Sequence, residues 1–321
     1  MVKDIWFRNH FIRDAIGKAL YDKMKEDPSI YLMGEGSHMK MRFDSPDIAR
    51  EFPERILTLP ISEDANTNFA VGASLIGVKP IVDVITADFL YRTMDSICNT
   101  AAKTDYLYPG RTIVIRAEFM TGGPTTGQRL ESLFCHIPQL RVVIPSYPDY
   151  AYELMKQALD YKGITIFFED REIKDSEFAS FDSRALIKSF NGDKLTVITY
   201  GLTTRQLHRL IYEHNLQNSV DLIPLQTICP IDWEMIYAHA KHTGKVLIVE
   251  PDMAYMGVGA EISARIGENC EVGFQEMEDP IKIKVKRLGM KRTVIPASLG
   301  LHDQLQPSDT DIVKTIEEMI A

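Results

Sequence analysis

The sequence has little cysteine, and its cysteines are far apart. Only four occur in 321 residues, and no two of them form a Cys-x-x-Cys pair. This spacing suggests neither a disulfide framework nor a zinc site. We expect these residues to be reduced and mainly buried: Cys98, Cys135, Cys229 and Cys270.

Long apolar runs are also absent. No uninterrupted apolar stretch approaches the length of a membrane span, and residues 1–10 have no apolar core of the signal-peptide type. The sequence therefore predicts a cytoplasmic protein without a membrane partner.

The chain lacks the common phosphate-binding and nucleic-acid-binding patterns. It contains no Gly-x-x-x-x-Gly-Lys-Ser/Thr, and Gly257-Val258-Gly259 lacks the rest of a dinucleotide fingerprint. Lys and Arg number 36 against 45 Asp and Glu, which gives a net charge of -9, and the basic residues form no stripe. Nucleic acid is therefore not an expected partner.

What the sequence does contain is a regular alternation of short apolar runs and longer helical patterns. A chain of this length usually folds as two domains. Because parallel strands need crossover connections, the alternation predicts an α/β fold with a mainly parallel sheet and helices on both faces. The expected strands of the first half are 30–33, 55–61, 80–85, 112–116, 141–145 and 164–168.

The alternation lapses between Arg171 and Asn191 and then resumes. We place a linker in this polar segment, which predicts a first domain over residues 1–180 and a second, smaller one over 190–321. The expected strands of the second half are 194–200, 220–224, 245–250 and 282–287.

The segment Leu59-Pro60-Ile61-Ser62-Glu63 joins an apolar strand to a helix that opens with a carboxylate. Ser62 is a plausible N-cap, and the small and apolar residues 70–77 predict a buried helix. A carboxylate in such low-dielectric surroundings is suited to donating and retrieving a proton. Acidic residues in a first turn also favour the helix macrodipole, so the local pattern alone is explained more simply by helix capping.

Several motifs, taken in order, resemble the β subunit of the thiamine-diphosphate-dependent 2-oxo acid dehydrogenases, their decarboxylating component, within the transketolase-like superfamily. The resemblance covers nearly the whole chain. It implies two doubly wound domains: an N-terminal pyrimidine-binding-type thiamine-diphosphate domain and a transketolase C-terminal-like domain. The motifs lie at 32–35, 60–63, 87–89, 95 with 99–103, 130–138, 197–201, 230–233 and 257–262.

The resemblance implies a catalytic role for Glu63. In that family the matching glutamate contacts a ring nitrogen of the cofactor's aminopyrimidine, and proton exchange there promotes formation of the reactive ylide. Capping then becomes an additional role of the same side chain.

The same resemblance places three further residues at the cofactor. Phe89 is expected against the aminopyrimidine and Ile61 in the wall of the same pocket, although a lone Phe more often packs a core. Glu35 is expected to be a carboxylate that influences Glu63, or simply a solvated acidic residue of a loop.

One loop departs from the family pattern. Aligning on Gln128 and on residues 131–136 places Thr126 where relatives have a histidine, and a hydroxyl cannot titrate near neutrality. Arg129 replaces a small polar residue, and we expect it to pair with a carboxylate on a partner's surface, or with an acidic or phosphorylated substrate. His136 matches the family, and we expect it to be a hydrogen-bonded structural histidine and not a substitute acid.

The diphosphate-binding motif of the family is missing. Relatives of this kind hold the diphosphate and its Mg²⁺ through Gly-Asp-Gly and a later Asn, whereas this chain has only Gly192-Asp193-Lys194, in the wrong domain. The resemblance therefore implies an α subunit that carries Gly-Asp-Gly, holds most of the Mg²⁺ ligands and completes an α2β2 heterotetramer. Thiamine diphosphate would then lie at the subunit interface.

Three functions remain open at this point. The chain is either the β subunit of an enzyme that decarboxylates a 2-oxo acid and passes the acyl group to a lipoyl acyltransferase, or a transketolase-like or acyloin-forming carboligase subunit. Thr126 motivates the second alternative. The third is a non-catalytic scaffold or regulatory partner, which the presence of Glu63 opposes.

Overall fold

A computed structural model describes residues 12–35, 46–120, 123–170, 190–268 and 283–321. The chain forms two compact units: Met1–Thr121 with Thr125–Ala179, and Gly122–Pro124 with Ser180–Ala321. Most of the expected linker, residues 171–189, lies outside the described residues.

The first unit is built on a parallel sheet. Its strands are β1 (Ile30–Glu35), β2 (Ile56–Leu59), β3 (Lys79–Thr86), β4 (Thr112–Phe119), β5 (Leu140–Val143) and β6 (Gly163–Asp170). They lie in the order β2-β1-β3-β4-β6-β5, and every pairing is parallel. Every residue of β4 and β6 is buried, as is typical of a parallel sheet covered on both faces.

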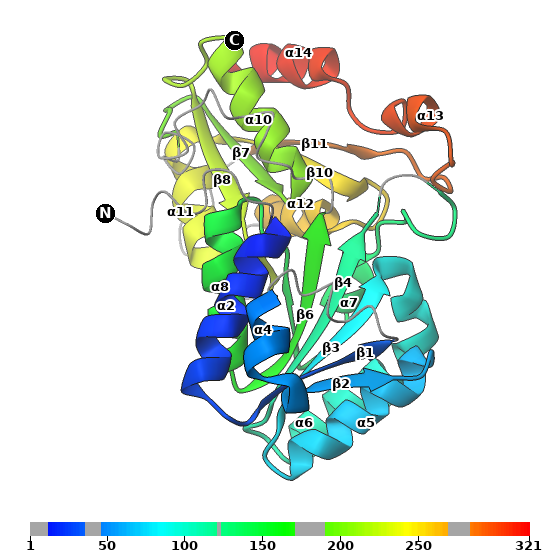
Figure 1. Ribbon diagram of the computed structural model, residues 1–321. Coiled ribbons are helices and arrows are strands. Elements are labelled where there is room, and N and C mark those ends of the chain that lie inside the picture. The colour runs from blue at the N-terminus through cyan, green and yellow to red at the C-terminus, as the bar shows by residue number, and fades with distance from the viewer. Residues whose placement is uncertain (1–11, 36–45, 121–122, 171–189, 269–282) are drawn as a thin grey trace. The chain divides into compact units, whose positions relative to one another are not determined.

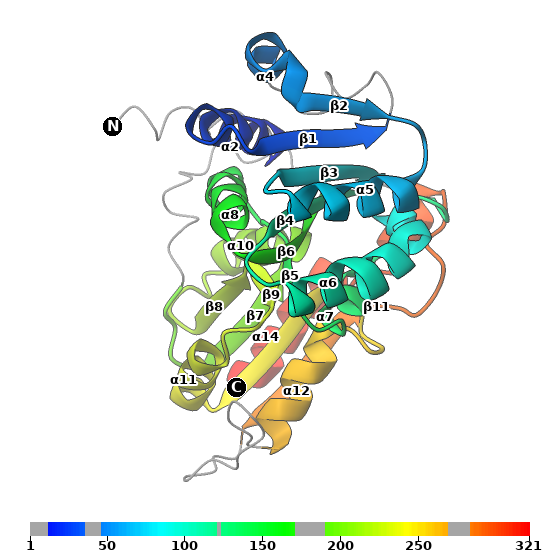
Figure 2. The ribbon, with the colours of Figure 1, turned by 90° about the horizontal axis from the view of Figure 1, so that it is seen from below.

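Helices cover both faces of this sheet. On one face lie α2 (Ile12–Glu26) and α8 (Pro148–Asp160), which pack side by side, and on the other lie α5 (Glu63–Leu75) and α6 (Ala102–Leu107) (Figures 1 and 2). The shorter elements are α4 (Pro46–Glu51), α7 (Glu131–Cys135), the 3₁₀ turns Pro53–Arg55 and Ala87–Thr93, and the π-helical turn Ser96–Ala101.

The second unit repeats this architecture with a smaller parallel sheet. Its strands β7 (Leu195–Tyr200), β8 (Val220–Leu225), β10 (Lys245–Met253) and β11 (Lys284–Met290) lie in the order β11-β10-β7-β8. Four helices pack on these strands. They are α10 (Leu202–Glu213) and α14 (Asp309–Ile320), which also contact each other, and α11 (Trp233–Thr243) and α12 (Val258–Glu268). The unit also contains β9 (Thr227–Cys229) and α13 (Leu299–Asp303).

The predicted fold class is confirmed, since each expected apolar run is a strand and each unit is a parallel α/β layer structure. Strand β9 was not expected, because three residues are too few to show a period. Among the described residues, no helix is long and apolar enough to cross a bilayer.

The expected burial of the helix after Glu63 is only half right. Ala70, Val71 and Ser74 are buried on the side of α5 that faces the sheet. On the opposite side, Phe69 and the C-terminal Ile76 are 51% and 84% exposed. The apolar residues of α5 therefore belong to two faces of the helix, and only the face toward the sheet is buried. Within the described residues, Cys98, Cys135 and Cys229 are thiols and form no disulfide, but they are half-buried where burial was expected.

The second unit has a histidine in its interior. His208 on α10 is 2% exposed and meets the ring of Phe190 edge-on, with 5.3 Å between ring centroids. Burial, aided by the nearby charge of Arg205, lowers the pKa of His208 to about 4.

This shift predicts an acid-sensitive second unit. As the pH falls from about 6.5 to about 4, the unfolded chain takes up a proton at His208 that the native chain rejects, so stability is lost by up to about 3 kcal/mol. Urea unfolding followed by tryptophan fluorescence at a series of pH values measures this loss. We expect His208→Gln to flatten the pH dependence, while His214→Gln, at the exposed end of the same helix, leaves it unchanged. Identical pH profiles for His208→Gln and the wild type would contradict the assignment.

Candidate active site

The candidate site lies at the carboxyl edge of the first sheet. Glu35 is the last residue of β1 and is in register with Leu59 at the end of β2. Thr86 at the end of β3 is likewise in register with Glu118 of β4. Because these neighbouring strands are parallel, the segments that follow them emerge at one edge, where open α/β sheets usually bind their ligands.

Glu63 is the first residue of α5, four residues after the end of β2. Its side chain is only 8% exposed, and Arg92 Nε lies 3.6 Å from its Oε2. Ser62 occupies the N-cap position as expected, but its side chain makes no capping hydrogen bond. Within the described residues the Glu63 carboxyl group accepts no hydrogen bond either, so it is buried and available to a ligand.

The other expected cofactor-binding residues lie at the same edge. Glu35 is buried at the end of β1, and Phe89 is half-buried in the 3₁₀ turn that follows β3. Ile61 follows β2 and is 81% exposed, an unusual setting for a large apolar side chain. The structure therefore gathers these three residues and Glu63 around the ends of three adjacent strands.

The loop that carries Thr126 is tied to the end of β3. The carbonyl oxygen of Thr126 accepts hydrogen bonds from the Thr86 hydroxyl, at 3.4 Å, and from the backbone N–H of Met120, at 3.3 Å. The backbone N–H of Gln128 donates to Asp88 Oδ2 at 3.1 Å. Thr126 and Gln128 are thereby held beside the turn that contains Phe89.

Asp88 and Arg92 are site residues that the sequence interpretation missed. Burial raises the pKa of the Asp88 carboxyl, while the hydrogen bond from Gln128 opposes that shift. The signal in the sequence was an acid directly before Phe89 at the end of a buried strand. Nothing in the sequence indicated that Arg92 faces Glu63.

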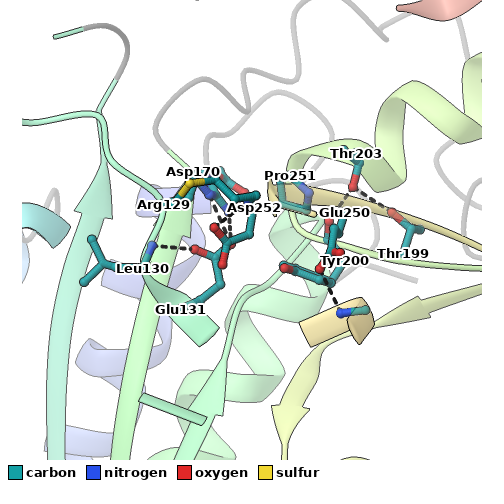
Figure 3. Close-up of polar contacts among 12 residues, drawn as sticks. Arg129, Leu130, Glu131, Asp170, Thr199, Tyr200, Thr203, Glu250, Pro251 and Asp252 are labelled. Carbon is teal, nitrogen blue, oxygen red and sulfur yellow. Dashed lines mark hydrogen bonds and ion pairs between the residues drawn. The ribbon is translucent and has the colours of Figure 1, made fainter. Parts of the chain in front are cut away.

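The interpretation of Arg129 as a surface residue that pairs with a partner was wrong. Arg129 is 7% exposed; its Nη2 lies 2.7 Å from Glu131 Oε1, and its Nη1 donates to Asp170 (Figure 3). Its guanidinium also stacks 3.6 Å from the ring centroid of Phe119. Burial alone lowers the pKa of Arg129, but the carboxylates of Asp170 and Glu131 raise it above its usual range. Two buried carboxylates require a cation, and Arg129 supplies it.

His136 is not brought to the other site residues. It is the exposed C-cap of α7, on the connection that leads to the amino end of β5. Its place between helix and strand agrees with the sequence interpretation. Within the described residues, no hydrogen bond to its side chain supports the structural role that was expected.

A second buried ion pair lies between strands β4 and β6. Arg116 Nε donates to Glu169 Oε1 at 2.7 Å, and Nη2 donates to Oε2 at 3.0 Å. Asp83 and Glu118 add further negative charge nearby, and burial raises the pKa of Glu169. The apolar appearance of these strands in the sequence concealed this pair.

Comparison with known families matches both units. Residues 10–174 match the family model "Transketolase, pyrimidine binding domain", and residues 183–312 match "Transketolase, C-terminal domain". These two matches together define a transketolase-like protein of the thiamine-diphosphate-dependent superfamily.

Individual relatives narrow the class. The chain is 30% identical to the 2-oxoisovalerate dehydrogenase subunit beta of Bacillus subtilis, covering 84% of this chain and 86% of the relative. It is 25% identical to the pyruvate dehydrogenase E1 component subunit beta of Rickettsia bellii, covering 96% and 98%. The chain belongs to the family of β subunits of thiamine-diphosphate-dependent 2-oxo acid dehydrogenases, as its motifs predicted.

Two further similarities are informative. The acetoin:2,6-dichlorophenolindophenol oxidoreductase subunit beta of Cupriavidus necator is 27% identical over 94% of each chain. A solved structure titled "Split gene transketolase, inactive beta4 tetramer" superposes with a TM-score of 0.76 at 20% identity, covering 97% of this chain and 98% of that one. The structural likeness shows that the fold is shared.

The Arg129 cluster predicts a large stability effect. Arg129→Ala leaves Glu131 and Asp170 buried without their cation, so we expect the free energy of unfolding to fall by about 3–5 kcal/mol. Urea titration monitored by far-UV circular dichroism measures it. Arg50→Ala is the control, since the Arg50 side chain is 70% exposed and its loss should cost less than about 0.5 kcal/mol. Equal unfolding midpoints for the two variants would show that the cluster contributes nothing.

Proposed function

We propose that this chain is the β subunit of an α/β enzyme that decarboxylates a 2-oxo acid, and that Glu63 is its proton-exchanging residue. The observation that carries the proposal is the Glu63 carboxylate, which is buried at the carboxyl edge and accepts no hydrogen bond from the described part of the chain. Burying a carboxyl group without such a bond is costly, and a ligand that forms a hydrogen bond with it offsets that cost.

The residues around Glu63 suit the aminopyrimidine of thiamine diphosphate. When bound, thiamine diphosphate supplies an electron sink for the decarboxylation of a 2-oxo acid. Glu63 exchanges a proton with a ring nitrogen of that group, and low-dielectric surroundings strengthen the contact. Phe89 and Ile61 provide aromatic and apolar surface that excludes water, and Glu35 is a second buried carboxylate on the neighbouring strand.

The remainder of the cofactor requires a second subunit. The chain lacks Gly-Asp-Gly, so we propose that an α subunit carries this motif, binds the diphosphate and holds most of the Mg²⁺ ligands in an α2β2 heterotetramer. The exposed apolar residues Ile61, Phe69 and Ile76 support contact with another subunit, because soluble monomers rarely leave such a group uncovered.

The physiological acceptor is proposed to be a lipoyl group on an acyltransferase, since relatives at 25–30% identity are 2-oxo acid dehydrogenase subunits. A second candidate is carboligation to an aldehyde or ketone. It is favoured by Thr126, which stands in the loop where relatives have a histidine. The similarity to an acetoin oxidoreductase subunit also favours it. The catalytic setting of Glu63 opposes a purely regulatory role.

Replacing Glu63 separates catalysis from helix capping. In the complex with the α partner, we expect Glu63→Gln to lower turnover by about 10²–10⁴-fold, because the amide cannot exchange the proton. Asp64→Asn is the matched control: it removes the other acid of the same first turn, which is exposed and accepts from Ser96. We expect Asp64→Asn to change turnover by less than a few-fold. Equal losses in both variants would assign Glu63 to the macrodipole alone.

A pair of assays distinguishes the two acceptors. With a 2-oxo acid as donor, the assembled wild-type complex is offered a lipoyl domain in one assay and an aldehyde in the other. The proposal predicts acylation of the lipoyl domain and little carboligation product. Carboligation without acylation would replace the dehydrogenase assignment with the second candidate. If neither product forms and no cofactor binds to the assembled complex, the proposed function is wrong.

A further inference from the structure

A small cavity in the second unit is lined by none of the residues proposed above. Its volume is about 230 Å³, and Figures 1 and 2 show α11 and β8, the two elements that supply most of its wall. The cavity is lined by Asn191, Gly192, Asp221, Ala238, His239 and His242.

The strand pattern explains why a carboxylate is buried there. Val220 and Leu222 point into the apolar core, so Asp221 between them points to the opposite face of the sheet. Asp221 is in register with Thr196 of β7 and forms an antiparallel bridge with Asn191. Gly192 permits this close approach, because a Cβ atom there would lie 2.2 Å from the backbone nitrogen of Val220.

Asp221 holds His239 in a fixed orientation. Its Oδ2 lies 2.6 Å from His239 Nδ1, and the Thr196 hydroxyl lies 3.4 Å from the same oxygen. The Asp221 side chain is 3% exposed, and among the described residues His239 is the group that forms an ion pair with it. When Nδ1–H donates to this carboxylate, the lone pair of Nε2 is left to face a ligand.

His242 lies one helical turn further along α11 and lines the same cavity. Residues three apart on a helix lie on one face, so both imidazoles are presented together. Histidine that donates its second ring N–H to a carboxylate is the usual arrangement of a metal ligand. A cation at this position also offsets the buried charge of Asp221.

We propose that His239 and His242 bind an exchangeable divalent transition-metal ion, such as Zn²⁺ or Cu²⁺, and that Asp221 is a positioning residue for His239. Imidazole is a preferred ligand of these ions. Within the described residues no three His, Cys, Asp or Glu side chains share a metal position, so the site supplies two protein imidazoles. The cavity has room for water at the remaining coordination positions.

Calorimetric titration of the full chain with Zn²⁺ tests the site. We expect one ion per chain, an affinity at least tenfold weaker in His239→Ala and in His242→Ala, and one about 10–100-fold weaker in Asp221→Asn. His214→Ala, which removes an exposed histidine at the end of another helix, should bind as the wild type does.

A spectroscopic readout identifies the ligands. Electron paramagnetic resonance of Cu²⁺ bound to the wild type should show coupling to imidazole nitrogens, and this coupling should be lost in the His239→Ala/His242→Ala double variant. Circular dichroism checks that each variant is folded. If Asp221→Asn does not fold, His239→Ala and His242→Ala decide the outcome. No Zn²⁺ uptake, or uptake that neither histidine variant weakens, would overturn the proposal. Neither result depends on catalytic activity.

Discussion

The parallel pairing of β2, β1, β3 and β4 is the constraint on which the rest of the first unit depends. Because the strands are in register and parallel, the residues that follow each of them emerge at one edge. Glu35, Glu63 and Phe89 are far apart in the sequence, and this pairing places all three at or just after the ends of adjacent strands. An antiparallel neighbour would have sent one of these segments to the opposite edge.

Buried charges then fix the surroundings of this edge. Arg129 is enclosed by Glu131, Asp170 and the ring of Phe119, and Arg116 pairs with Glu169 between adjacent strands. Moving such charges out of water is costly, and the cost is offset only when each cation meets carboxylates at close range. Glu63 differs from these carboxylates. It is buried, but its ion pair with Arg92 is longer, at 3.6 Å, and its oxygens accept no hydrogen bond from the described residues. The contrast separates groups that stabilise the fold from the group proposed to act on a cofactor.

Much of the fold could be predicted from the sequence, because apolar runs of strand length alternate with helical patterns in both halves. The family was also predictable, since ordered motifs around Glu63 and Gln128 carry more information than any single pattern. Contacts between distant residues could not be predicted. Arg129 was assigned to the surface because Asp170 lies 41 residues away, and Asp221 and His239 are separated by 18 residues. The helix after Glu63 was expected to be buried, since composition alone does not show that the sheet covers only one of its apolar faces.

The central claim is that Glu63 activates a cofactor whose diphosphate another subunit holds. The most direct test is the rate at which the thiazolium carbon proton of thiamine diphosphate exchanges for deuterium in the assembled complex, measured by quenched-flow nuclear magnetic resonance. The account predicts exchange at least about 100-fold slower with Glu63→Gln than with the wild type at equal cofactor occupancy. Equal exchange rates in the two complexes would contradict it.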